Sequence, residues 1–266
     1  MQKDSKGMII IILAAAMIVV VAISSLYSYS GMGRPLTVVE SNSMQHSDDT
    51  SYLGVIDTGD MAVMVSPDKK GVTTYFDGLS SGYSKFGAYG DVIIYYRENK
   101  NPVIHRAIIW LEYADGKWSA PSLKDYEKGT IWDNPGTWDD LSGVLSFYYL
   151  PYKDGTMSAS VNLDSMKDSG LAHSGYLTKG DRNVTFDQSS EIHSGPVEKS
   201  ELKAIAGIEI PWLGCVKLLV NHKNVGMIPH NSVPCLAVFI IDILTFFVLI
   251  SVLLDYRMKL KEDVCP

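Results

Sequence analysis

Two long apolar stretches lie near the ends of the chain and enclose a middle of alternating character. Residues 8–23 are apolar without interruption, and with extension to Tyr27 this stretch reaches roughly the 20 residues that a helix needs to cross a bilayer. A second stretch covers residues 233–254. The pattern predicts transmembrane helices at 8–27 and 233–254. A cleavable signal peptide is the alternative for the first, because Ser24 and Ser25 are small, but the apolar run is long for a signal-peptide core.

Basic residues flank the outer end of each stretch. Two of them, Lys3 and Lys6, precede the first, and three follow the second: Arg257, Lys259 and Lys261. The positive-inside rule then places both termini and the tail 255–266 in the cytoplasm and residues 34–230 outside, as a two-span protein of the cell membrane. Asp242 lies in the middle of the second stretch, where an acid is costly unless it is protonated or faces another helix or water.

The middle of the chain has the pattern of short strands separated by turns. Apolar and alternating runs bounded by Gly, Asp, Asn and Pro predict strands at 36–39, 61–65, 90–96, 103–111, 143–150 and 176–178. Residues 71–90 are rich in Gly, Ser and Tyr and show no helical period. Residues 112–170, with three tryptophans among turn residues, are predicted to be an insertion or small subdomain, its aromatic side chains forming core or meeting membrane or substrate. The sequence therefore predicts a mainly β domain between two membrane helices.

Composition narrows the classes of function. The formal net charge is -7, which argues against nucleic acid as a partner. The topology separates the three cysteines, with Cys215 outside, Cys235 in or near the membrane and Cys265 in the cytoplasm, so no disulfide is expected. The six histidines show no close metal-ligand spacing. We expect neither a metal nor a cofactor.

A serine just after the first predicted strand is the candidate nucleophile. A serine hydroxyl is a poor nucleophile until a base takes its proton, so Ser43 needs a base close by. His105, in the strand 103–111, is the preferred base, and Asp181 or Asp187 is expected to orient it. His46, in a polar loop, is a rival base. The alternative for each is structural, since serine and aspartate are common in turns and helix caps.

Six short motifs follow one another along residues 36–217. They are Ser41-Asn42-Ser43-Met44, Ile56-Asp57-Thr58-Gly59-Asp60, Gly90-Asp91-Val92-Ile93-Ile94-Tyr95, Ile104-His105-Arg106, Lys179-Gly180-Asp181 and Ile210-Pro211-Trp212-Leu213-Gly214. In this order they resemble the type I signal peptidases of the archaeal and endoplasmic-reticulum kind, especially archaeal members with a C-terminal membrane span. The chain departs from the family at Asn42, where glycine is common, at His46, where proline is common, and at Arg182, where asparagine is usual.

The resemblance implies a mainly antiparallel β fold and a serine peptidase of the histidine type. Ser43 then attacks the scissile carbonyl, and His105 is the general base and afterwards the general acid. The family has two acids six residues apart, which match Asp181 and Asp187. The sequence does not decide which of them contacts the imidazole. We favour Asp187 for that contact, with Asp181 supporting the fold of the loop or giving a second hydrogen bond. The implied oxyanion donors are the Ser43 N–H and the hydroxyl of Ser41, which otherwise bonds only its own backbone.

The implied substrates are signal-peptide-bearing preproteins cut after small residues in the Ala-x-Ala manner, with the lipid bilayer and the secretion translocon as partners. An extended peptide can add to a sheet edge, its side chains entering pockets. The expected pocket wall consists of Met44, Asp91, Val92, Ile93 and Ile94. Asn183 begins a glycosylation sequon, which we expect to be unmodified because a glycan would crowd the site. Two alternatives stay open: a membrane-anchored binding or adhesion domain without activity, and a related peptidase for a specialised surface-protein precursor.

Overall fold

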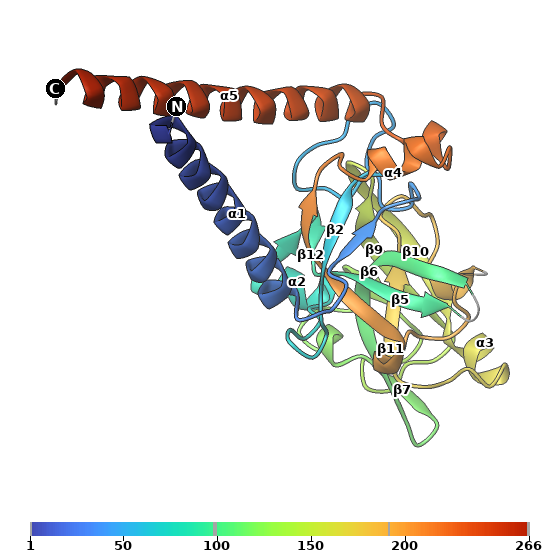
Figure 1. Cartoon of the computed structure of the whole chain (residues 1–266). Helices are drawn as coiled ribbons and strands as arrows, with labels where there is room; N and C mark the ends of the chain where they lie inside the picture. The colour runs from blue at the N-terminus through green and yellow to red at the C-terminus, as the bar shows by residue number, and fades with distance from the viewer. Residues whose placement is uncertain (1, 98–99, 191, 265–266) are drawn as a thin grey trace.

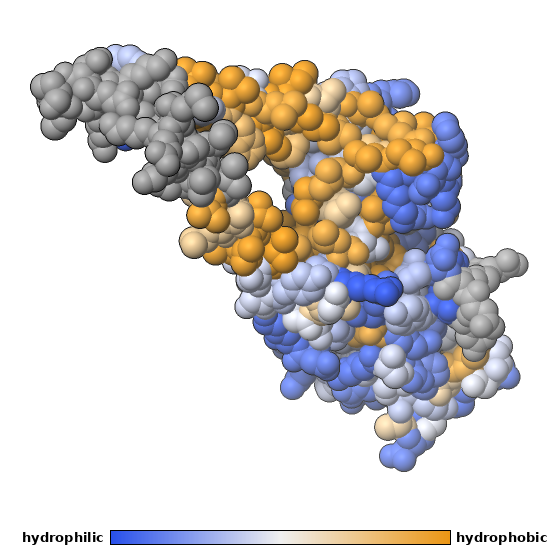
Figure 2. All heavy atoms as spheres, in the orientation of Figure 1, coloured by the Kyte–Doolittle hydropathy of each residue, from blue (hydrophilic) through white to orange (hydrophobic). Residues whose placement is uncertain are grey.

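Two long helices extend from a β-rich body in the computed structural model (Figure 1), which describes residues 2–97, 100–190 and 192–264. Helix α1 covers Gln2–Ser30 and helix α5 covers Ser232–Val264. Their segments Leu13–Ser30 and Ser232–Leu254 are long and apolar enough to cross a membrane, with mean hydropathies of 1.8 and 2.8. Figure 2 shows apolar side chains gathered on both helices. The predictions at 8–27 and 233–254 are confirmed to the extent that both stretches are helices of this kind.

The body is built on an antiparallel sheet in which, within the described residues, seven strands pair. The strand order is β1-β2-β12-β5-β6-β11, and β7 pairs with β6. The strands are β1 Leu36–Val38, β2 Met61–Val65, β5 Val92–Arg97, β6 Lys100–Ala114, β7 Lys117–Ser119, β11 Gly175–Lys179 and β12 Leu202–Ile210. All of these pairs are antiparallel. The mainly antiparallel β fold class is therefore confirmed, and each strand predicted from the sequence overlaps an observed one.

Apolar side chains on both faces of the central strands hold this sheet together. Strand β5 lies between β12 and β6, and its residues 92–95 are all buried. Because successive side chains of a strand point to opposite faces, burial of all four means that both faces of β5 are covered. The register pairs Ile93 of β5 with His105 of β6, and His105 is only 2% exposed. The sheet therefore fixes this histidine in the interior.

Residues 112–170 add a second sheet rather than a separate domain. Its strand order is β10-β9-β8, with β8 Trp132–Asp133, β9 Val144–Tyr152 and β10 Gly155–Asn162, accompanied by η1 Pro121–Leu123 and α3 Leu163–Asp168. Trp118, Trp132 and Phe147 share one buried cluster with Ile109 of β6 and Leu177 of β11. The insertion thus shares its core with the main sheet, and two of its three tryptophans are core residues.

A short helix occurs where the sequence shows no helical period. Helix α2 covers Tyr75–Ser81, and a small hairpin follows it, formed by β3 Ser84–Lys85 and β4 Ala88–Tyr89. The helix begins with a capping box in which Thr74 and Asp77 bond each other's backbone N–H groups. Two turns are too short to establish a periodic pattern, so the capping residues carry the signal.

The segments after β11 complete the body and lead into α5. They contain the 3₁₀ helices η2 Asp187–Ser189, η3 Lys199–Glu201 and η4 Val225–Met227, and helix α4 Cys215–Val220. The start of α5 is held by Ser51, whose N–H donates to Asn231 Oδ1 at 2.7 Å and whose carbonyl accepts from Asn231 Nδ2 at 3.1 Å. Cys215 and Cys235 are free cysteines; Cys265 lies outside the described residues.

Candidate active site

Ser43 lies in a loop that several backbone hydrogen bonds hold in place. The Val39 N–H, just after β1, donates to the Asp60 carbonyl at 2.9 Å, and the Gly59 N–H donates back to the Val39 carbonyl at 3.0 Å. Past the serine, the Arg182 N–H donates to the carbonyl of Ser43 at 2.8 Å. The loop is thus fixed on both sides of the candidate nucleophile.

Asp60 joins two of the sequence motifs to the base of this loop. Its carbonyl binds Val39, and its carboxylate accepts from the N–H groups of Asp57 and Trp212, each at 2.8 Å. The turn before it needs Gly59, whose φ is +96° and whose added Cβ would lie 2.4 Å from the Cys215 Sγ. The Ile56–Asp60 and Ile210–Gly214 motifs therefore meet at one carboxylate, and the backbone carbonyl of the same residue holds Val39, which precedes the Ser43 loop.

His105 and Asp187 form a buried, directly bonded pair. The His105 Nδ1 lies 2.7 Å from the Asp187 Oδ2, with both side chains almost entirely shielded from solvent. A carboxylate only accepts hydrogen bonds, so Nδ1 carries the proton and Nε2 keeps a free lone pair. This is the tautomer that a general base needs. The structure thus places Asp187, which the sequence favoured over Asp181, against the imidazole.

Tyr95 supplies a second hydrogen bond to the same carboxylate oxygen. Its hydroxyl donates to the Asp187 Oδ2 at 2.7 Å. Burial, with the Asp187 carboxylate alongside, raises the pKa of Tyr95, so its hydroxyl remains a donor. Sequence reasoning missed this residue. The available signal was the strand period, because Tyr95 lies two residues after Ile93, the register partner of His105.

Asp181 binds Arg106 rather than the histidine. The Arg106 Nε and Nη2 donate to the two Asp181 oxygens at 2.9 and 2.6 Å, and both side chains are fully buried. The remaining Arg106 donors bind backbone carbonyls of the hairpin region, those of Lys85, Phe86, Ala88, Tyr89 and Gly90. Asp181 is therefore the buried partner of Arg106, which binds the β3–β4 region. Asp187, and not Asp181, contacts the imidazole.

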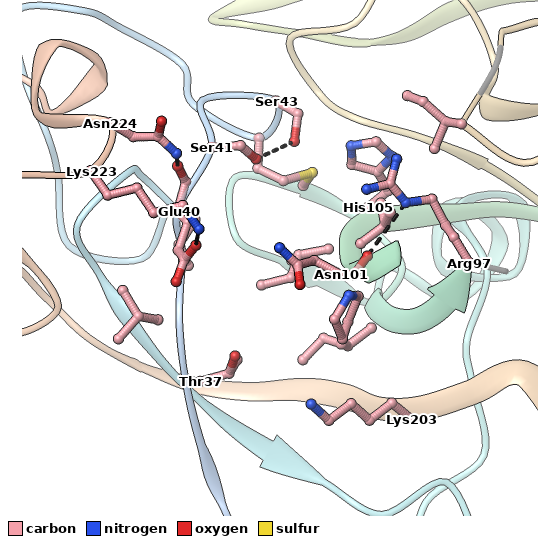
Figure 3. Close-up of a pocket in the computed structure, with 18 of the residues that line it drawn as sticks. Thr37, Glu40, Ser41, Ser43, Arg97, Asn101, His105, Lys203, Lys223 and Asn224 are labelled. Carbon is pink, nitrogen blue, oxygen red and sulfur yellow. Dashed lines mark hydrogen bonds and ion pairs between the residues drawn. The ribbon is translucent and has the colours of Figure 1, made fainter. Parts of the chain in front are cut away.

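Ser43 and His105 face one cavity of about 660 Å³ (Figure 3). No hydrogen bond joins the Ser43 Oγ to His105 among the described residues; the Ser43 Oγ lies 3.2 Å from the Ser41 Oγ instead. Gly180 marks how close the two partners are. A Cβ added there would lie 2.6 Å from the Ser43 carbonyl oxygen and 2.9 Å from the His105 Nε2. A side chain at position 180 would not fit between these two groups, so the close approach requires glycine.

The two candidate oxyanion donors lie at the same cavity as Ser43 and His105. Ser41 lines the cavity together with Ser43. Within the part of the chain that the structure describes, the Ser43 N–H donates to no other protein group. That N–H and the Ser41 hydroxyl are therefore available to an oxygen that develops negative charge beside Ser43.

The structure brings only two residues of the expected pocket wall to the cavity. Met44 and Ile94 line the cavity, whereas Asp91, Val92 and Ile93 do not. Asp91 is fully buried and accepts from the Lys70 Nζ and the Tyr83 hydroxyl, each at 2.8 Å. Val92 is covered within the cluster that contains Met44. Ile94 lines the cavity, and Ile93 points to the other face of β5, because successive side chains of a strand alternate between its two faces.

His46 is buried and lies outside this cavity. It is 9% exposed, and its Nε2 lies 3.3 Å from where a Cβ of Gly87 would be. It is absent from the described cavity lining, in contrast to His105. The geometry therefore favours His105 as the base. Asn183, of the sequon, also lines the cavity, so a glycan there would occupy the site.

A buried lysine connects the insertion to the loop after β11 that contains Gly180. Lys179 is fully buried, and its Nζ donates to the carbonyls of Pro151 and Gly180 at 2.8 and 3.0 Å. The neighbouring Lys153 N–H donates to the Asp181 carbonyl at 2.9 Å. Burial lowers the pKa of Lys179 to about 8, against the attraction of Asp181 and Asp187. No local sequence pattern predicts this contact, because Pro151 lies 28 residues away.

Within the described ranges, no group of three or more His, Cys, Asp and Glu side chains is arranged to hold a metal ion. No protein-family model matches the chain, and no curated protein matches it either.

Proposed function

We propose that this protein is a membrane-bound serine endopeptidase that removes N-terminal signal peptides from preproteins after small residues. The observation that carries the proposal is the 2.7 Å contact between His105 and Asp187 beneath the cavity that also holds Ser43. This contact gives the imidazole the orientation and the tautomer of a base for a serine hydroxyl. The order of the sequence motifs along residues 36–217 supports the same conclusion.

In this mechanism the Ser43 Oγ attacks the scissile carbonyl while the His105 Nε2 takes its proton. The Ser43 N–H and the Ser41 hydroxyl stabilise the oxyanion. The imidazolium then gives its proton to the leaving amine, and water hydrolyses the acyl-enzyme by the same route. Asp187 stays ionised and stabilises the imidazolium.

The substrate binds as an added strand beside β1. This strand is at one end of the sheet order, and Thr37, Val38 and Val39 line the cavity. An edge strand offers unpaired backbone groups to an extended peptide, and the side chains of Met44, Ile94 and Ile104 supply apolar walls for small residues. With both apolar helices in the membrane, the body acts on the outer face, next to a preprotein emerging from the translocon.

The test is initial-rate cleavage of a preprotein with an Ala-x-Ala site by the full chain in detergent or liposomes. Ser43→Ala should lower the rate by at least about 10⁴-fold, the order found when a triad member is removed. His105→Ala should have a similar effect, and His46→Ala should keep most of the activity. A folded Ser43→Ala variant that cleaves at the wild-type rate would refute the proposal and favour a binding or adhesion domain.

A further inference from the structure

The cavity that holds Ser43 and His105 is strongly cationic in a protein of net charge -7. Four basic side chains line it: Arg97, Lys203, Lys217 and Lys223. They come from the end of β5, from β12, from α4 and from the segment after α4. Figure 3 shows Lys223 across the cavity from Arg97 and Lys203. Residues far apart in the sequence thus bring the same charge to one place.

One carboxylate offsets part of this charge. Glu40, which directly precedes Ser41, accepts from the Lys217 Nζ at 2.9 Å and from the Lys223 Nζ. These two hydrogen bonds lower the pKa of Glu40. The Asn224 side chain also donates to the Glu40 backbone carbonyl, at 2.6 Å. Lys217 and Lys223 therefore have a carboxylate partner within the protein, and this contact holds the segment that leads to Ser43.

Arg97 and Lys203 differ from these lysines, because neither forms an ion pair with a carboxylate among the described residues. The Arg97 Nε donates to the Asn101 carbonyl at 3.4 Å, and the Lys203 Nζ lies 5.8 Å from the centre of the Tyr96 ring. With His105 neutral, the charged lining residues leave the cavity with a net charge of +3. A recess lined by one sign of charge concentrates its field on whatever binds there.

We infer that this cavity includes a subsite for a carboxylate side chain of the substrate, formed by Arg97 and Lys203, so that the enzyme prefers peptides with Asp or Glu within about four residues of the scissile bond. The inference rests on the proposed function and names the substrate class of that site. The limit of four residues follows from the length of an extended peptide, in which each residue covers about 3.3 Å and four residues cover about 13 Å. A lysine in the same place would meet like charges and be disfavoured.

The test uses synthetic peptides with an Ala-x-Ala site and Asp, Asn or Lys at each of the four positions on either side of the cut. The full chain in zwitterionic detergent should give its highest kcat/KM with Asp, about 10-fold above Lys at the best position, with a difference that shrinks as salt increases. Lys203→Glu should reverse the order, and Arg97→Glu provides an independent second reversal. Lys128→Glu makes the same charge change in the insertion, away from the cavity, and should leave the order unchanged.

Binding separates this inference from the proposed function. In the Ser43→Ala variant, fluorescence anisotropy of the labelled peptides measures the Asp-to-Lys affinity ratio without cleavage. If no peptide is cleaved by the wild type but the ratio reverses in Lys203→Glu, the peptidase proposal fails and the anionic subsite stands. If peptides are cleaved with equal kcat/KM for Asp and Lys, the subsite is overturned and the peptidase stands. A preference that occurs only in vesicles containing anionic lipid would assign the cations to lipid headgroups and overturn the inference.

Discussion

Tyr95 and His105, on neighbouring strands, both contact the same oxygen of Asp187, each at 2.7 Å. The tyrosine comes from β5 and the histidine from β6, and Asp187 begins the 3₁₀ helix that follows the β11 loop. Two donors on one oxygen fix the carboxylate in position and moderate its basicity. The orientation of the imidazole therefore depends on the sheet register as well as on the acid.

Tyr95→Phe should lower kcat by about 10-fold, because one hydrogen bond to a charged group is lost while the packing is kept. The carboxylate then interacts more strongly with the imidazolium, so the acid limb of the kcat/KM profile should move to higher pH. Tyr176→Phe is the matched control, since Tyr176 is buried in the same cluster. An unchanged profile in Tyr95→Phe would mean that the tyrosine does not position Asp187.

Asp187→Asn and Asp181→Asn should fail in different ways. The first leaves the fold largely intact but lets the imidazole adopt the wrong tautomer, with an expected loss in kcat of about 10⁴-fold. The second leaves the buried Arg106 charge unpaired, at a cost of about 3 kcal/mol in the free energy of unfolding. Thermal unfolding together with single-turnover rates distinguishes them. If Asp181→Asn were as stable as the wild type and inactive, the assignment of the two acids would have to be exchanged.

Gly180→Ala should reduce kcat by about 100-fold, because the added methyl group displaces either the Ser43 loop or the His105 ring. The positions of these groups, 2.6 and 2.9 Å from the new Cβ, leave no room for it. Gly71→Ala is the control, since nothing lies within 4 Å of its Cβ position. Comparable activity of the two variants, measured at equal folded fraction, would contradict the close approach.

Much of this arrangement could be predicted, and the reason differs from residue to residue. Strand alternation located β5 and β6 and therefore His105, and motif order located Ser43 and Asp187. Asp91 was misassigned because its partner, Lys70, lies 21 residues away, and no local pattern shows that contact. Helix α2 was missed because its signal is a cap rather than a period. Local periodicity thus specifies elements, whereas the partners of buried polar groups depend on the assembled sheet.

The stability of the body should fall as the pH rises from about 4 to 7. Burial raises the pKa of Asp60 and that of Glu209, each to about 7. Their usual values are 3.8 and 4.5, so between those values and 7 the folded state binds more protons than the unfolded state, and raising the pH favours unfolding. Glu209→Gln keeps an acceptor for the Gly54 N–H and removes one titration. The melting temperature of this variant should depend less on pH than that of the wild type. An equal pH dependence in the two proteins would show that Glu209 does not contribute to it.

Lys179→Met should lower kcat, because it removes the contact between the insertion and the loop after β11 that contains Gly180. Methionine retains most of the length and apolar contact of the lysine but removes the donor to the Pro151 and Gly180 carbonyls, and the Gly180 carbonyl then keeps only its bond from the Asn183 N–H. Because Gly180 lies against both Ser43 and His105, we expect kcat to fall by roughly 10- to 100-fold with KM nearly unchanged.

The charge of Lys179 gives that experiment a second readout. The groups that face it are Asp181, Asp187, Arg106 and the ring of Tyr152, 5.7 Å from its Nζ. Removing the positive charge stabilises the imidazolium, so the acid limb of kcat/KM should move to higher pH. Lys167→Met is the control, because its Nζ also binds a backbone carbonyl, that of Gly116 at 3.0 Å, elsewhere in the insertion. If both variants lost activity only in proportion to their unfolded fraction, Lys179 would be a purely structural residue and the insertion would have no part in positioning the loop.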